Sequence, residues 1–266
     1  MTITVDHEPT ARSRANERPA LSISHLQVWQ LRLDDDGLSQ AIAGISRAPG
    51  GLLSADELSR AERFHFEKDR IRFTRCRSAL RLLLSRFLDV PPEKIRFSYT
   101  TNGKPEVSED QNPQSLRFNL SHSDNMAVIA VGVGSAIGVD IERMRDHVNT
   151  VDLAERFFSA REREALRSLP ENLRFQAFYA CWARKEAFLK ANGEGLSFPL
   201  SDFSVSVHPQ MPPRIQEIKG NANAALNWSL IDLTLAEGFR SAVAVEHPHA
   251  KATVFVLDAL TIGELQ

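Results

Sequence analysis

Two segments of this sequence share an order of predicted elements that strongly limits how the chain can fold. Each runs from a long helical pattern through strands to a strand of small and β-branched residues, NMAVIAVGV at 125–133 and RSAVAVEHP at 240–248. This repeat predicts two similar α+β halves that meet near residue 134. The alternative is a chance similarity between two buried strands, because short apolar strands look alike.

Helices and strands are both predicted around this repeat. Ser54 and Glu57 form a capping-box pattern that begins a helix over 53–66. Further helices are predicted over 68–88, 151–169 and 174–193, and strands at 25–34, 95–107, 116–133, 135–144 and, in the main, beyond 203. We therefore expect an α+β fold with a mobile tail at 1–20, a first half at 21–134 and a second half at 135–266.

The composition excludes several classes of protein. The 266 residues carry 32 Lys and Arg against 34 Asp and Glu, a net charge of −2, so we expect no nucleic-acid partner. Cys76 and Cys181 stand far apart without a zinc or disulfide pattern, which fits a reducing cytoplasm. The polar N-terminus lacks the apolar core of a signal peptide, and no apolar run approaches the ~20 residues of a membrane span. We expect a cytoplasmic protein without membrane contact.

Two carboxylates share one face of the strand predicted at 135–144. In GVDIE at 138–142, Asp140 and Glu142 alternate with Val139 and Ile141, which separates the two acids by roughly 7 Å at Cα. Like charges so placed repel unless a cation lies between them, and Mg²⁺ typically binds one or two carboxylates together with substrate phosphates. The alternative is a solvent-exposed end of a strand, where carboxylates are common.

A polar segment separates the two strands predicted within 116–133. We expect FNLSHSDN to form a loop that carries Asn119, Ser121, His122 and Ser123. Hydroxyl and imidazole groups there would suit phosphate oxygens. The alternative is a turn satisfied by its own side chains.

A tight turn is predicted at NGKP, residues 102–105. Gly103 permits the turn geometry, Lys104 stands at its tip and Pro105 fixes the following chain. The lysine is a candidate phosphate ligand, and the alternative is an ordinary exposed turn lysine.

Positive charge concentrates in the predicted helices between residues 60 and 86, which hold nine Arg or Lys and three Asp or Glu. Arg72 falls on the apolar stripe of its helix, where a guanidinium needs an anionic partner. The alternative is a solvated basic face with aliphatic stems packed underneath.

The helix predicted at 174–193 places charges among apolar residues. Lys185 falls inside the apolar arc, Glu186 at its edge and Lys190 just beyond. A surface pair between Glu186 and Lys190, worth about 0.2–0.5 kcal/mol, explains two of these charges. For Lys185 we expect a phosphate or a buried carboxylate nearby.

The order and spacing of five segments carry a family resemblance. NGKP, FNLSHS, GVDIE, RFFSARE and CWARKEAFLKANGEGLS together resemble the 4′-phosphopantetheinyl transferases of the larger single-chain (Sfp) type, from about residue 53 to 205. The resemblance implies two similar halves in a pseudo-dimer, each a small, mostly antiparallel sheet packed with a long helix. It also implies a Mg²⁺-dependent enzyme that moves the phosphopantetheine arm of coenzyme A onto a serine of an apo carrier protein and releases 3′,5′-ADP.

The same resemblance implies roles for individual residues. It assigns Mg²⁺ to Asp140, Glu142 and Glu186, and catalysis to Glu186, Lys190 and Asp140, with Glu186 as the base for the carrier serine. The implied coenzyme A contacts are Arg60, Arg72, Lys104, Pro105, Ser121, His122 and Lys190. Glu57 departs from the family pattern, which sometimes has a coenzyme-binding lysine there, and Glu162 matches an acid without an assigned role.

The implied partners are coenzyme A and apo carrier domains of polyketide, peptide or fatty-acid synthases, and two fused halves imply a monomer. Two other functions stay open at this point. One is a non-catalytic module of the same fold that binds a carrier protein or a nucleotide, against which the presence of all three acids argues. The other is an unrelated Mg²⁺-dependent phosphohydrolase.

Overall fold

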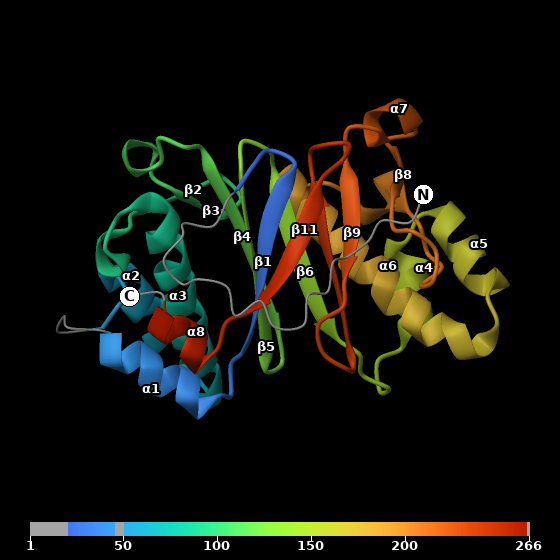
Figure 1. Cartoon of the computed structure of the whole chain (residues 1–266). Helices are drawn as coiled ribbons and strands as arrows, with labels where there is room; N and C mark the ends of the chain where they lie inside the picture. The colour runs from blue at the N-terminus through green and yellow to red at the C-terminus, as the bar shows by residue number, and fades with distance from the viewer. Residues whose placement is uncertain (1–20, 46–50, 265–266) are drawn as a thin grey trace.

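The molecule has four layers, in the order helices, sheet, sheet, helices (Figure 1). The computed structural model describes residues 21–45 and 51–264, so the tail predicted at 1–20 lies outside the described residues. One sheet has the strand order β11-β1-β5-β4 and the other β6-β10-β9. Aliphatic side chains from both sheets form one buried cluster between them, and each long helix covers the outer face of one sheet.

The first half of the chain contributes short helices, a small hairpin and most of one sheet. Its elements are β1 (His25–Arg32), α1 (Asp36–Ile45), α2 (Ala55–Glu62), α3 (Glu67–Leu88), η1 (Pro92–Lys94), β2 (Phe97–Tyr99), β3 (Pro105–Val107), η2 (Glu109–Gln111), β4 (Leu116–Ser123) and β5 (Met126–Val133). The helix predicted over 68–88 is confirmed as α3, whereas the one predicted over 53–66 is the shorter α2.

The second half repeats this plan with a different set of short elements. They are β6 (Ile137–Arg143), α4 (Thr150–Phe157), α5 (Ala160–Ser168), α6 (Glu171–Asn192), η3 (Gly195–Ser197), η4 (Leu200–Asp202), β7 (Phe203–Val205), β8 (Ile215–Ile218), α7 (Ala222–Ala225), β9 (Ser229–Leu233), β10 (Phe239–Val245), β11 (Lys251–Val256) and α8 (Ala259–Glu264). Within the described part of the chain, no helix is both long and apolar enough to cross a bilayer.

Sheet topology confirms the repeat. In each half the chain runs strand, long helix, strand, strand, as β1, α3, β4, β5 and then β6, α6, β9, β10. The last strand of each set is central, with β5 between β1 and β4 and β10 between β6 and β9, all antiparallel. The two segments that suggested the repeat are therefore the equivalent central strands, and the predicted α+β fold of two similar halves is confirmed.

The last strand of the chain crosses to the first sheet. β11 pairs with β1 in parallel, and the ring of Phe255 stacks on Trp29 with centroids 4.6 Å apart. In Figure 1, β11 lies beside β1. Helix α8, near the C-terminus, lies next to α1, near the N-terminus. The division at residue 134 stays a prediction, and residues 251–264 lie with the first half in space.

Candidate active site

Gly138 sets the distance between strand β6 and helix α6. A Cβ at this position would lie 2.1 Å from the carbonyl oxygen of Ala187 and 2.2 Å from the amide nitrogen of Ala191, so only glycine fits. The helix backbone therefore lies directly on the strand. Because side chains alternate along a strand, Asp140 and Glu142 share the face of Gly138, while Val139 and Ile141 point into the core between the sheets.

Asp140 joins polar groups of both halves. Its Oδ1 accepts hydrogen bonds from the Lys190 ammonium at 2.6 Å and from the Ser121 hydroxyl at 3.0 Å. Lys190 Nζ also donates to Ser121 Oγ at 2.8 Å. Lys190 thus makes its ion pair with Asp140 of β6, not with Glu186 one turn before it.

The second oxygen of Asp140 is free. The side chain is only 4% exposed, and Oδ2 is buried without a hydrogen-bond partner. A buried acceptor without a partner is unfavourable by roughly 1–3 kcal/mol. This oxygen is therefore available to a metal ion or to a donor on a ligand.

Glu142 and Glu186 complete an acidic cluster around Asp140. Burial first, and then the charges of Asp140 and Glu186, raise the pKa of Glu142 to about 7, although a hydrogen bond from Ser123 opposes this shift. Burial and Asp140 also raise the pKa of Glu186, while Lys190 opposes. Three acids facing one ammonium leave an excess of negative charge, which a cation would relieve.

This cluster fits Mg²⁺ on chemical grounds. Mg²⁺ is usually held by one or two carboxylates together with waters and substrate phosphates, rather than by a complete protein cage. Within residues 21–45 and 51–264, no three His, Cys, Asp or Glu side chains are grouped so that they alone could hold a metal ion. The free Oδ2 of Asp140 and the neighbouring acids match the open site that such an ion needs.

Polar side chains alternate along β4 and tie it to β6. Asn119 Oδ1 accepts a hydrogen bond from the amide of Val139 at 2.8 Å, and Ser121 and Ser123 donate to the two acids of β6. The predicted loop at 119–123 is wrong, because these residues pair with β5 along the whole segment. They stay in a strand because their polar groups bond to the neighbouring strand instead of to water.

Basic groups gather near the C-terminal end of β4. Partial burial of the His122 ring lowers its pKa, and the positive charges of Lys190 and Arg72 lower it further. Arg72 pairs with Asp124 at 3.2 Å, the anionic partner that its place on the apolar stripe requires. The hydrogen-bond donors of Lys190, Arg72 and His122 thus lie close together, which suits a bound anion such as phosphate.

The NGKP turn lines a cavity of about 260 Å³ between the halves. Lys104 and Pro105 line it from the first half and Asn192 from the end of α6. The Nδ2 atom of Asn192 is buried there without a hydrogen-bond partner. Burial lowers the pKa of Lys104 to about 8, and its ammonium donates to two backbone carbonyls of the second half.

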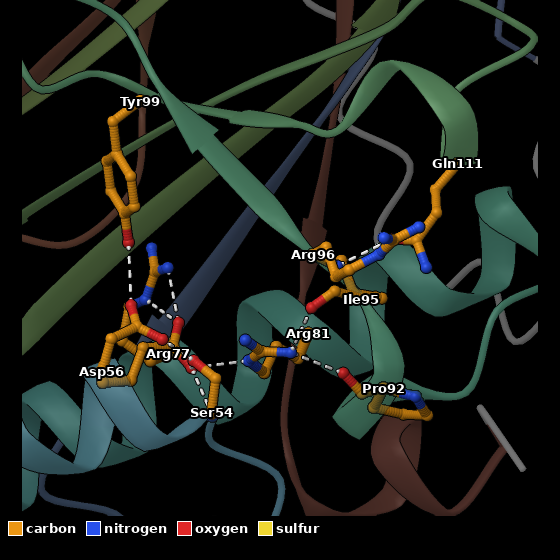
Figure 2. Close-up of polar contacts among 10 residues, drawn as sticks. Ser54, Asp56, Arg77, Arg81, Pro92, Ile95, Arg96, Tyr99 and Gln111 are labelled. Carbon is orange, nitrogen blue, oxygen red and sulfur yellow. Dashed lines mark hydrogen bonds and ion pairs between the residues drawn. The ribbon is translucent and has the colours of Figure 1, made fainter.

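Glu57 has a structural role in this protein. It is 2% exposed and accepts hydrogen bonds from Arg77 at 2.7 Å and from Arg81 at 2.6 Å, which ties α2 to α3. Figure 2 shows the guanidinium groups of Arg77 and Arg81 reaching from α3 toward α2. Arg60 stays at the surface of α2, with its guanidinium 5.5 Å from the ring centre of Phe73.

Lys185 has a buried carboxylate as its partner, one of the two alternatives expected for it. Its Nζ lies 2.7 Å from both oxygens of Glu162 and 2.8 Å from the carbonyl oxygen of Phe203. The two side chains are 1% and 0% exposed, and Glu162 also accepts hydrogen bonds from the amides of Ser159 and Val205. Every ammonium donor is used, so this pair fixes α6 against α5 and β7.

The structure brings most predicted site residues together. One group comprises Asp140, Glu142, Glu186, Lys190, Ser121, His122 and Arg72. Lys104 and Pro105 lie at the cavity beside the end of α6, and Arg60 lies over the ring of Phe73 at the surface. Sequence reasoning missed the close approach at Gly138 and the contact from Ser123 to Glu142. The alternation of polar residues at 119, 121 and 123 was the signal for the second.

Comparison with known proteins adds independent evidence. Residues 48–133 match 4′-phosphopantetheinyl transferase, N-terminal, and residues 136–244 match the 4′-phosphopantetheinyl transferase superfamily. The chain is similar to 4′-phosphopantetheinyl transferase HetI of Nostoc sp., with 40% identity over 221 residues, which are 83% of this chain and 87% of the relative. A 4′-phosphopantetheinyl transferase of Bacillus subtilis is 31% identical over 196 residues, 74% of this chain and 83% of that protein.

These matches define the chain as a transferase. It belongs to the 4′-phosphopantetheinyl transferase family.

Proposed function

We propose that this chain transfers the 4′-phosphopantetheine arm of coenzyme A to a serine of an apo carrier protein, with Mg²⁺ bound, and releases 3′,5′-ADP. One observation carries the proposal. An acidic cluster with a free carboxylate oxygen lies next to basic groups suited to phosphate, between the two halves. A pyrophosphate bound there would touch a metal on one side and cations on the other.

Asp140, Glu142 and Glu186 are the residues that would hold Mg²⁺. The bound ion would neutralise charge on phosphoryl oxygens. Because the pKa values of Glu142 and Glu186 are raised, both carboxyls become protonated as pH falls toward their pKa values. Mg²⁺ must then displace these protons in order to bind.

The basic groups would bind the phosphates. Lys190, which is 29% exposed beside Asp140, can donate to the bridging oxygen as charge develops on it. His122 and Arg72 would hold the remaining phosphate oxygens, and Ser121 would orient Lys190. Lys104 has one ammonium hydrogen left for a phosphate, and Pro105 lines the cavity beside it. Arg60, at the surface of α2, would contact coenzyme A only at its adenosine end.

Glu186 is the proposed base. Its carboxylate takes the proton of the carrier serine, directly or through water, and the serine oxygen bonds to the phosphorus of the arm. The bond from this phosphorus to the bridging oxygen breaks, and its electron pair leaves on 3′,5′-ADP. Burial and the charge of Asp140 raise the pKa of Glu186 in the metal-free protein, whereas a bound Mg²⁺ would lower its proton affinity, so metal binding and base action compete at this carboxylate. General-base help of this kind is typically worth ~10²–10⁴-fold in rate.

The direct test is a loading assay with coenzyme A, Mg²⁺ and several apo carrier domains from polyketide, peptide and fatty-acid synthases. We expect a mass gain of one phosphopantetheine on at least one carrier, and none on a carrier whose serine is replaced by alanine. No gain on any carrier would refute the proposal. Binding of coenzyme A without transfer would favour a non-catalytic module, and phosphate release from simple esters would favour a phosphohydrolase.

We also propose that the working form is a monomer. Ser121 and Arg72 come from the first half and Asp140 and Lys190 from the second, so one chain supplies both sides of the site. Light scattering of the active protein should give the mass of one chain. Activity confined to a dimer fraction would contradict this part of the proposal.

A further inference from the structure

The turn between β2 and β3 reaches across to the second half and contacts the end of the helix that carries Lys190. Lys104 Nζ donates to the carbonyl oxygen of Lys190 at 2.7 Å and to that of Ile137 at 2.9 Å. Asn102 Nδ2 donates to the carbonyl oxygen of Gly193 at 2.8 Å. Three backbone acceptors of the second half are thereby satisfied by two side chains of the first.

Two of these acceptors, the carbonyls of Lys190 and Gly193, lie at the end of α6, where a helix needs partners. The last four carbonyls of a helix have no intrahelical donor, and Lys190 is within the last turn of α6. Gly193 follows as the left-handed cap at φ 78°, and Asn102 packs 3.5 Å from the position of a Cβ on Gly195. A lysine ammonium at this end also interacts favourably with the helix dipole. The turn therefore covers the end of α6 with both polar and packing contacts.

The second carbonyl bound by Lys104 belongs to β6. Ile137 directly precedes Gly138, where the helix backbone touches the strand. Lys104 thus bridges the two elements whose contact places Lys190 beside Asp140. Loss of these two hydrogen bonds would therefore shift the Lys190 side chain relative to Asp140 and Glu142.

We propose that Lys104 and Asn102 form a clasp, defined as these two side chains and their three carbonyl acceptors, that positions Lys190 for transfer. The inference rests on the proposed function, because it assigns Lys190 to the reacting pyrophosphate. Lys104 and Asn102 act as positioning residues through the backbone of α6. With two of its three ammonium hydrogens on carbonyls, Lys104 acts first on α6 and only secondarily on coenzyme A.

The first test does not depend on activity. Hydrogen–deuterium exchange is measured on the full-length protein without coenzyme A, for wild type, Lys104→Met and Asn102→Ala. We expect peptides covering 187–196 to exchange about tenfold faster or more in both variants, because hydrogen bonds that held this turn are lost. The matched controls Lys94→Met and Thr101→Ala, which alter an exposed lysine and an exposed residue of the same turn, should exchange as wild type does.

The second test separates positioning from phosphate binding. Carrier loading is measured with coenzyme A and with coenzyme A that lacks its 3′-phosphate. The clasp predicts that Lys104→Met and Asn102→Ala lower kcat by about 10- to 100-fold, with little change in KM and an unchanged preference between the two coenzymes. A higher KM with normal kcat in Lys104→Met, together with normal kcat in Asn102→Ala, would show that Lys104 acts only as a phosphate ligand and would overturn the clasp.

The two tests also separate the clasp from the proposed function. Unchanged exchange at 187–196 in both variants overturns the clasp even if wild type loads carriers normally. If wild type loads no carrier, the exchange experiment still decides whether the turn holds the end of α6. A global loss of folding in Lys104→Met would appear in all peptides, and Asn102→Ala, which leaves the half-buried lysine in place, then decides the result.

Discussion

At the residue scale, surroundings distinguish the glutamates of this protein. Glu186 lies near Asp140 and Lys190, and burial and the neighbouring negative charge raise its pKa. Glu162 is more deeply buried, but its oxygens accept hydrogen bonds from Lys185 and from two backbone amides. Glu162 therefore has no capacity left for a substrate proton, whereas Glu186 has. A glutamate side chain therefore has a structural role at position 162 and is a candidate base at position 186.

Replacing the candidate base tests this distinction. Glu186→Gln should lower the rate of carrier loading at least ~10²-fold, because an amide cannot accept the serine proton. Asp140→Ala should lower it to a similar extent, because Lys190 loses its ion-pair partner. Single-turnover loading followed by mass spectrometry measures both rates. Glu194→Gln, an exposed change just beyond α6, is the matched control and should leave the rate unchanged. Near-normal turnover in both site variants would refute the assigned site.

Glu142 gives the protein a specific dependence of stability on pH. Its pKa of about 7 lies above the ordinary 4.5, so the folded state binds the proton more tightly than the unfolded chain. The stabilisation from this group is complete below pH 4.5 and is lost as pH rises through 7. Glu142→Gln lacks the titrating group and should lack this loss.

Urea unfolding without metal, at several pH values from about 5 to about 8, measures the difference. We expect the free energy of unfolding of wild type to fall relative to that of Glu142→Gln across this range. Saturating Mg²⁺ should reduce the fall, because a bound cation favours the ionised carboxylate. A constant difference between the two proteins would contradict the raised pKa.

The orientation of a side chain could be predicted where it depends on the periodicity of a single strand or helix. Alternation along GVDIE was enough to put Asp140 and Glu142 on one face. The helical arc was enough to predict an anionic partner for Lys185, a phosphate or a buried carboxylate, and the partner is Glu162. The partner of Lys190 could not be found in this way. Spacing along one helix offers only Glu186, whereas the actual partner, Asp140, is 50 residues away on another element.

At the element scale, the contact between β6 and α6 controls the geometry of the site. Strand and helix backbones touch at Gly138, and the acids and Lys190 follow within the same two elements. Helix–sheet contacts normally leave room for side chains, so this close approach is specific to the glycine. Sequence alone gives the glycine but not its neighbour, because the contact depends on how the helix lies on the sheet.

Gly138→Ala tests the close approach. A methyl group 2.1 Å from a backbone oxygen must push α6 away from β6, so we expect a loss of stability of about 1–3 kcal/mol and a marked loss of carrier loading. Urea unfolding and the loading assay measure the two effects. Gly44→Ala in α1 is the matched control, because no atom lies within 4 Å of the added methyl, and it should be neutral or slightly stabilising. Equal behaviour of the two variants would contradict the contact.

Strand β4 shows where element prediction fails. A run of Asn, Ser and His looks like a loop because such residues usually bond to water or to their own backbone. Here Asn119, Ser121 and Ser123 bond instead to β6, an element that follows later in the chain. Polar strands of this kind are visible only once the neighbouring strand is placed.

At the scale of the whole molecule, the two halves share a core. The cluster between the sheets takes side chains from β1 and β5 on one side and from β6, β9 and β10 on the other. The repeat in the sequence predicts two similar α+β halves, and the family resemblance predicts the small sheet and long helix of each half. The repeat could not predict that β11 returns to β1, because both halves end in similar apolar strands and no repeat unit contains the returning strand.

Separate expression of residues 1–134 and 135–266 tests how far the halves depend on each other. The first fragment lacks β11, which pairs with six residues of β1, and both fragments expose the shared core. We therefore expect neither fragment alone to unfold cooperatively in urea, whereas the two expressed together should restore a transition and carrier loading. Tryptophan fluorescence follows the first fragment through Trp29, which stacks on Phe255 in the intact chain.

A fragment that carries β11 and α8 on a linker tests whether these two elements stabilise the first half. Residues 251–264 joined to the end of the first fragment by a flexible linker would return β11 and α8 to their places beside β1 and α1. This fragment should regain part of the transition, because the edge of β1 is paired again and Leu257 and Ile262 are buried again. A cooperative transition in residues 1–134 alone would show instead that the boundary at 134 separates two independent folding units and that β11 is dispensable.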